Sequence, residues 1–126
     1  MEKLIEISGK EVGFKATALT PRLYRHKMQR DMIQDMAHLR KALNKVNKLP
    51  KDATEEQRED AQLSVMDLEI FENVAFVMAK QYDPTIKDDV GEWLDSFDMF
   101  SIYVILPQLL ELWAMNEKTT AIPKKK

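Results

Sequence analysis

This sequence predicts a mainly helical domain with an N-terminal β-hairpin. Two predicted helices, from 20 to about 46 and from 54 to about 80, carry apolar residues every three or four positions from Met28 to Val46 and from Leu63 to Met78, which is the period of an α-helix. Residues 3–16 instead alternate apolar and polar side chains around a glycine, as the strands of a hairpin do. A chain of 126 residues can bury one hydrophobic core, so we expect residues 1–115 to form a single domain.

The hairpin is predicted from residues 3–16, KLIEISGKEVGFKA. Ser8-Gly9-Lys10 supplies the turn, because glycine accepts the positive φ that a tight turn needs. A lone hairpin is marginally stable in water, so it should lay its apolar face on helices or pair with another copy through an exposed edge. The side chains of that apolar face are Ile5, Ile7, Val12, Phe14 and Ala16.

The first long helix is predicted to begin with Thr20 as N-cap and Pro21 in the first helical position, and to run to about residue 46. We interpret its narrow apolar stripe as a core face. The alternative is an adaptable binding groove, since methionine side chains are flexible and fill irregular gaps. The stripe consists of Met28, Met32, Met36, Leu39, Leu43 and Val46.

The second long helix is predicted from a capping box at Thr54-Glu55-Glu56-Gln57 and should reach about residue 80. Two adjacent apolar stripes cover more than half of its circumference, which predicts a central position in the fold. Asp67 lies inside this apolar arc. We therefore expect Asp67 at the rim of the core, paired with a base from the first helix.

The final third begins with a turn at Asp83-Pro84, followed by a short helix over about 89–97. Residues 93–113, WLDSFDMFSIYVILPQLLELW, are the most apolar stretch of the chain. Its uncharged run of twelve residues is shorter than the roughly 20 that a bilayer core requires, so we expect no membrane span.

Pro107 interrupts this apolar stretch and removes one helical hydrogen bond. It predicts a kinked C-terminal helix, or a break between residues 99–106 and 108–115. The first half is then the core strip, and the second half is turned outward. Residues 116–126 are polar and end in three lysines, so a flexible basic tail is expected there.

Composition argues against catalysis and bound cofactors. The chain has no cysteine, two histidines and three glycines, which leaves no disulfide framework, thiol chemistry or glycine-rich phosphate loop. His26 and His38 are out of phase on one helix and cannot chelate one metal together. Asp31 and Asp35 are best explained by local ion pairs. We therefore predict no enzyme, no metal and no cofactor.

Charge is distributed unevenly along the chain. Residues 22–51 hold nine Lys or Arg against two acids, net +7, and residues 52–98 hold fourteen acids against three bases, net −11. One interpretation is that the two helical segments pair through opposite charge. The other is a basic face, 22–48, of a small nucleic-acid-binding regulatory protein. The acidic pI of 5.7 and the absence of a helix-turn-helix pattern make nucleic acid the weaker alternative.

Four segments resemble tail assembly chaperones of long-tailed phages and prophages of Gram-positive bacteria. The longest is 83–113, DPTIKDDVGEWLDSFDMFSIYVILPQLLELW. The others are KLIEISGKEVGF in the hairpin, TPRLYRHKMQRDMIQDM at the first helix and LSVMDLEIFENVAFVMAKQYDP in the second. The resemblance covers nearly the whole chain in the same order and includes no catalytic signature.

The resemblance implies a small helical protein that acts during tail morphogenesis in the host bacterial cytoplasm and is absent from the mature virion. Such chaperones bind the tape measure protein and recruit tail tube subunits around it. Many also exist in a longer form made by ribosomal frameshifting, and the terminal Lys124-Lys125-Lys126 is compatible with a slippery A-rich site. A plain basic tail explains these lysines equally well. Self-association and a structural virion subunit remain open alternatives.

The family carries no established binding residues onto this chain. The candidate contacts are therefore chosen from the residues themselves, as flexible or apolar side chains that a client helix would meet. These predicted partner-binding residues are Met28, Met32, Met36, Leu109, Leu112 and Trp113.

Overall fold

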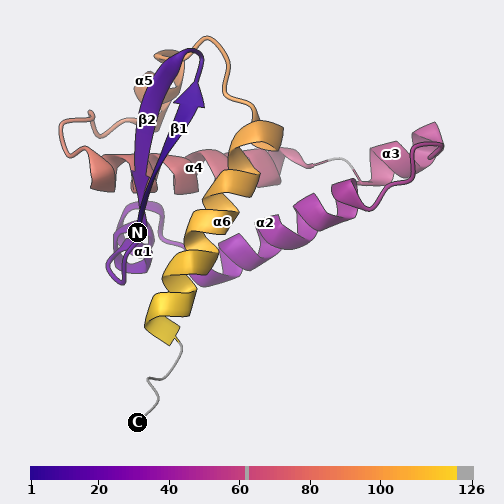
Figure 1. Ribbon diagram of the computed structural model, residues 1–126. Helices are drawn as coiled ribbons and strands as arrows, with labels where there is room; N and C mark the ends of the chain where they lie inside the picture. Colours follow the sequence, from indigo (N-terminus) through magenta and orange to yellow (C-terminus); the bar gives the residue numbers. More distant parts are fainter. Residues whose placement is uncertain (62, 122–126) are drawn as a thin grey trace.

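The computed structural model describes the backbone of residues 1–61 and 63–121, and side chains within 1–59 and 63–115. In this part of the chain, a two-stranded hairpin is followed by six helices (Figure 1), which confirms the predicted fold class. The elements are β1 (Glu2–Ile7), β2 (Lys10–Lys15), α1 (Thr20–Met28), α2 (Met32–Asn47), α3 (Glu55–Ala61), α4 (Val65–Tyr82), α5 (Val90–Asp95) and α6 (Ile102–Ala121).

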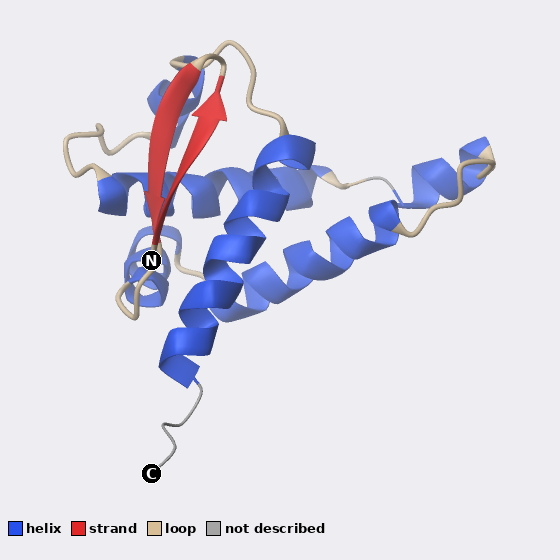
Figure 2. Cartoon of the chain, viewed as in Figure 1, coloured by secondary structure: helices blue, strands red, loops and turns tan. Residues whose placement is uncertain are grey.

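The hairpin is confirmed, with β1 antiparallel to β2 and Ile5 opposite Val12. Ser8 and Gly9 have φ of 52° and 78°, as the two central residues of a type I′ turn require. The hairpin crosses α4, which β2 contacts (Figure 2), and its apolar face is buried there. The hairpin is therefore supported by packing on a helix, the first of the two arrangements expected for it.

The first predicted long helix is wrong as a single element, because the chain forms α1 and α2 instead. Gln29 adopts a left-handed conformation with φ of 59°, and its N–H donates to the Arg25 carbonyl to close α1. Asp31 then caps α2 by accepting hydrogen bonds from the N–H groups of Ile33 and Gln34. These capping interactions turn the chain although the apolar period continues through the bend.

The N-cap assignment of Thr20 is also wrong. Thr20 is the first residue of α1, and Leu19 occupies the cap position without a side-chain hydrogen bond. The Thr20 hydroxyl instead donates to Gln81 Oε1 at 2.5 Å and accepts the Thr17 N–H. Thr20 is fully buried, so its hydroxyl joins the start of α1 to the end of α4.

The second predicted long helix is likewise divided, into α3 and α4. The capping box of Thr54 and Gln57 is confirmed, since each side chain accepts the backbone N–H of the other. A second capping box, formed by Ser64 and Asp67, begins α4. The Ser-x-x-Asp spacing at 64–67 is the sequence signal of this second start.

The core is built around α4, as its wide apolar arc predicts. α4 contacts β2, α1, α2, α5 and α6, and its residues from Val74 to Ala79 are all buried. An aromatic cluster closes the side near α5, where Trp93 packs edge-on against Phe76 and Phe97 with ring centroids 5.7 and 5.3 Å apart. The short helix predicted over about 89–97 is confirmed as α5, capped by Asp89.

α6 continues through Pro107, so the helix break that was predicted as one alternative does not occur. One residue after the proline, Gln108 Nε2 donates to the Val104 carbonyl at 3.0 Å. α6 continues beyond residue 115 to Ala121, so part of the predicted tail is helical. Lys124, Lys125 and Lys126 lie outside the described residues. None of the described helices has the length and apolarity needed to cross a membrane.

The outward turn predicted for the second half of α6 is wrong. Leu109, Leu112 and Trp113 are 0%, 1% and 4% exposed and belong to the central core. Their spacing keeps them on the same helix face as Ile105, so the helix carries them into the core along with its first half.

Candidate partner-binding surface

Five of the six predicted contact residues lie in the core. Met32 and Met36 on α2 are as fully buried as the three α6 residues, whereas Met28 on α1 is partly exposed. The structure therefore brings the predicted residues together as packing partners of one core, which agrees with the core interpretation of the methionine stripe. A client contact by the buried five stays a prediction, and it requires the core to open.

Three apolar side chains that are accessible to solvent lie just before α6 and in its first turn. Met99 is 73% exposed, Val104 58% and Tyr103 52%. We call these three residues the exposed rim. Large neighbouring apolar side chains that stay in water are typical of interaction sites. In the sequence, the exposed rim is hidden because the whole stretch 93–113 is apolar. The helical period was the available signal, since Tyr103 and Val104 fall off the stripe that contains Ile105 and Leu109.

The hairpin turn fixes the segment that leads into α6. Ser8 Oγ donates to the Met99 carbonyl at 2.8 Å and accepts the Met99 N–H at 2.9 Å. Lys10 Nζ donates to the Ser96 carbonyl at 2.7 Å. Ser8 holds a positive φ that is unusual for a residue with a side chain, and its two hydrogen bonds to Met99 help to offset that strain.

A groove of about 210 Å³ lies between the end of β1 and the first turn of α6. The buried Ile7 and Ile105 line it together with the exposed Met99 and Val104. Glu6, Ser8 and Ser101 complete the lining. We call this hollow the β1–α6 groove. Its size and apolar walls suit one apolar side chain of a partner protein.

A second apolar hollow, of about 270 Å³, lies between α1, α4 and the loop after α4. Two of its lining residues, Lys27 and Asp88, form an ion pair at 2.6 Å, and the Lys27 amine lies 6.0 Å from the ring centroid of Phe76, which also lines the hollow. The hydrogen bond from Lys27 lowers the pKa of Asp88. This pair joins the basic and acidic stretches of the chain, as the charge-pairing interpretation expects.

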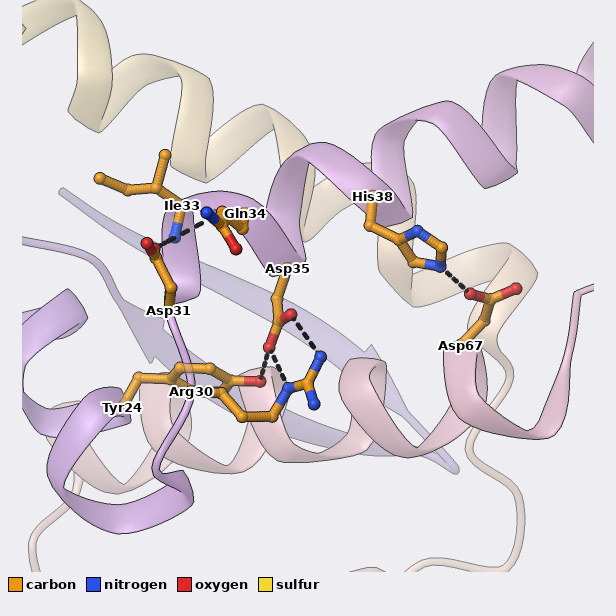
Figure 3. Close-up of polar contacts among 8 residues, drawn as sticks. All are labelled: Tyr24, Arg30, Asp31, Ile33, Gln34, Asp35, His38 and Asp67. Atoms are coloured by element: carbon orange, nitrogen blue, oxygen red, sulfur yellow. Dashed lines mark hydrogen bonds and ion pairs between the residues drawn. The ribbon is translucent and has the colours of Figure 1, made fainter.

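A polar network at the bend between α1 and α2 holds a buried carboxylate (Figure 3). The Tyr24 hydroxyl donates to Asp35 Oδ2 at 2.6 Å, and Arg30 donates to both carboxylate oxygens at 2.8 and 2.9 Å. Burial raises the pKa of Asp35, but the hydrogen bonds from Arg30 and Tyr24 outweigh it and leave the pKa below its ordinary value. The local ion pair predicted for Asp35 is confirmed, whereas Asp31 is a helix cap.

A second buried carboxylate joins α4 to α2 (Figure 3). Asp67 Oδ1 lies 2.5 Å from His38 Nε2, and Asp67 Oδ2 accepts the Ser64 N–H at 2.8 Å. This confirms the predicted pairing of Asp67 with a base from the first helical segment. Burial raises the pKa of Asp67, but the hydrogen bonds from Ser64 and His38 outweigh burial and leave the pKa below its ordinary value. Both carboxylates are thus engaged in holding helices together.

Among the side chains described, those of residues 1–59 and 63–115, no three of His, Cys, Asp or Glu are grouped closely enough to hold a metal ion. Comparison of the chain with family models, with curated proteins and with solved structures returns no match. The candidate surface is therefore defined by the geometry of this chain alone: an apolar groove, an exposed rim beside it, and a hairpin turn that holds both.

Proposed function

We propose that this protein is a non-catalytic tail assembly chaperone, which binds the tape measure protein and recruits tail tube subunits during tail morphogenesis. The observation that carries the proposal is the exposed rim of Met99, Tyr103 and Val104 beside the β1–α6 groove. An apolar surface of this kind binds apolar segments of another protein. The segment with the longest family resemblance, 83–113, contains α5, the exposed rim and most of the groove wall.

The proposed mechanism is reversible covering of apolar client surface. A client segment that would aggregate in water gains by burying an apolar side chain in the groove. The surrounding surface is charged, with 32% of the chain Asp, Glu, Lys or Arg, and this charge keeps a complex soluble. The proposed site of action is the host bacterial cytoplasm, with release before the virion is complete.

Co-expression with the tape measure protein tests this function. The client is expected to stay soluble and to co-purify with the native chain. Val104→Asp should abolish co-purification without unfolding the protein, because Val104 is exposed. Val65→Asp is the matched control, since Val65 is 81% exposed at the start of α4 and does not line the groove. A client that is equally soluble without this protein would refute the proposal.

The alternative function, nucleic-acid binding through residues 22–48, is supported by Lys41 and Lys45, which are exposed on one face of α2, and by Lys48, the exposed residue that caps its C-terminus. Other bases of this stretch are engaged within the protein. Lys27 is paired with Asp88, and Arg30 with Asp35. A salt-sensitive gel shift that is lost in Lys41→Gln/Lys45→Gln would favour this alternative, and co-purification of the client would be unaffected by the same variant.

A further inference from the structure

The β1–α6 groove has an uncompensated acidic edge on its hairpin side. Glu6 lines the groove, and the strand register places Glu11 directly opposite Glu6. Both side chains are exposed, and neither forms an ion pair with a residue in the described part of the chain. Like charges directly opposite each other destabilise a hairpin. The free protein therefore carries a repulsion at this edge that a positive charge from a partner would relieve.

The segment that leads into α6 also carries an acid, next in sequence to the groove-lining Met99. Asp98 is exposed and lies between Ser96 and Met99, the two residues that the hairpin turn binds. Lys10 donates to the Ser96 carbonyl and lies 5.8 Å from the Phe97 ring centroid, so its amine is engaged within the protein. The groove combines apolar walls with the carboxylate of Glu6 in its lining and that of Glu11 opposite Glu6.

We propose that the β1–α6 groove binds a basic amphipathic segment of the client protein. An apolar client side chain enters the hollow beside Val104 and Met99, and flanking Lys or Arg side chains meet Glu6, Glu11 and Asp98. Charge complementarity carries the choice of occupant, because an acidic segment or a nucleic acid would meet repulsion at the edge formed by Glu6 and Glu11. The inference rests on the proposed function and specifies the chemistry of the segment that the protein holds.

The probe is a short amphipathic peptide of leucine and lysine, compared with one in which glutamate replaces every lysine. Fluorescence anisotropy with the full chain should show tighter binding of the lysine peptide, and the affinity should fall as salt is added. Backbone NMR shifts should change at Glu6, Ser8, Met99 and Val104. These residues surround the groove, whereas Phe76 and Val77 line the other apolar hollow and should not respond.

The variant Glu6→Gln/Glu11→Gln should weaken binding of the lysine peptide by roughly three- to tenfold, the effect of two partly exposed charge contacts. It should also raise the melting temperature slightly, because the cross-strand repulsion is removed. Glu55→Gln/Glu56→Gln is the matched control. It makes the same change of charge on α3, and it should leave peptide affinity unchanged.

Equal affinity for the two peptides, an unchanged affinity of Glu6→Gln/Glu11→Gln, or shift changes confined to the other hollow would each overturn the inference. So would a dimer in which a second copy occupies the groove, detected by light scattering. The co-expression experiment separates the two proposals. If Val104→Asp abolishes client co-purification and Glu6→Gln/Glu11→Gln does not, the chaperone function stands and the basic-segment inference fails. If the native chain binds no client, the proposed chaperone function is refuted, and the peptide titration alone then tests whether the groove binds a basic segment.

Discussion

Adjacent apolar residues of α6 take opposite positions in this fold. Val104 is 58% exposed, whereas Ile105, the next residue, is 2% exposed, and the same contrast separates Tyr103 from Leu109. The residues of the exposed rim are about as apolar as the buried residues of α6, such as Ile105 and Leu109. The difference between them comes from the face of the helix that meets α4 and the hairpin. Apolar character alone therefore does not separate a contact surface from a core, and the predictions below test that separation.

The largest contrast is expected between Leu112→Asp and Val104→Asp. A carboxylate at position 112 would lie in the core without a partner, which costs several kcal/mol and is comparable with the stability of a whole domain. Leu112→Asp should therefore lose its cooperative thermal transition in circular dichroism. The free energy of unfolding of Val104→Asp should lie within about 0.5 kcal/mol of that of the native chain. A native-like transition in Leu112→Asp would show that the second half of α6 is not core.

Truncation to alanine should show the same contrast with folded variants. Leu109→Ala removes buried methyl groups and leaves a cavity, so the free energy of unfolding should fall by about 3 kcal/mol in urea titrations. Met99→Ala, at the exposed rim, should change it by less than about 0.5 kcal/mol. If the two losses are equal, Met99 is more buried in solution than in this structure.

The same comparison of buried with exposed positions applies to two carboxylates, Asp35 and Asp98. Asp35→Asn weakens the acceptor that Tyr24 and Arg30 share, and the free energy of unfolding should fall by about 2 kcal/mol. Asp98→Asn, in the exposed segment before α6, should have almost no effect on stability. Tyr24→Phe is a further check. It should cost less in the Asp35→Asn background than in the native chain, because the two residues share one hydrogen bond.

The smallest expected effect is on the pH dependence of stability. Asp35 and Asp67 have folded-state pKa values below the ordinary 3.8, so the unfolded chain binds their protons more readily. Their contribution is complete above the ordinary pKa and is lost as the pH falls through the lower folded-state values. Urea midpoints measured from about pH 5 to about pH 3 should decline less steeply in Asp35→Asn than in the native chain. A steeper decline would reverse the assigned direction.

Local signals in the sequence were sufficient for several elements. The alternation in residues 3–16 predicts the hairpin, the box at Thr54 predicts the start of α3, and the acids before Trp93 predict α5. The break at Gln29 is hidden because the apolar period continues across it, whereas the break before Ser64 is hidden because the capping box at Thr54 points to one continuous helix. A period reports which face of a helix is apolar. It does not report that a cap has ended one helix and begun another.

The sequence by itself determined the secondary-structure class, the central position of α4 and the presence of a strongly apolar C-terminal stretch, since these follow from periodicity and from burial of apolar side chains. Tertiary structure decided which of those apolar residues a partner can reach. Leu112 and Trp113 became core, and Met99, Tyr103 and Val104 became surface, because the hairpin turn and α4 cover one face of α6 and leave the other in water. Coverage of this kind depends on contacts between residues far apart in the chain.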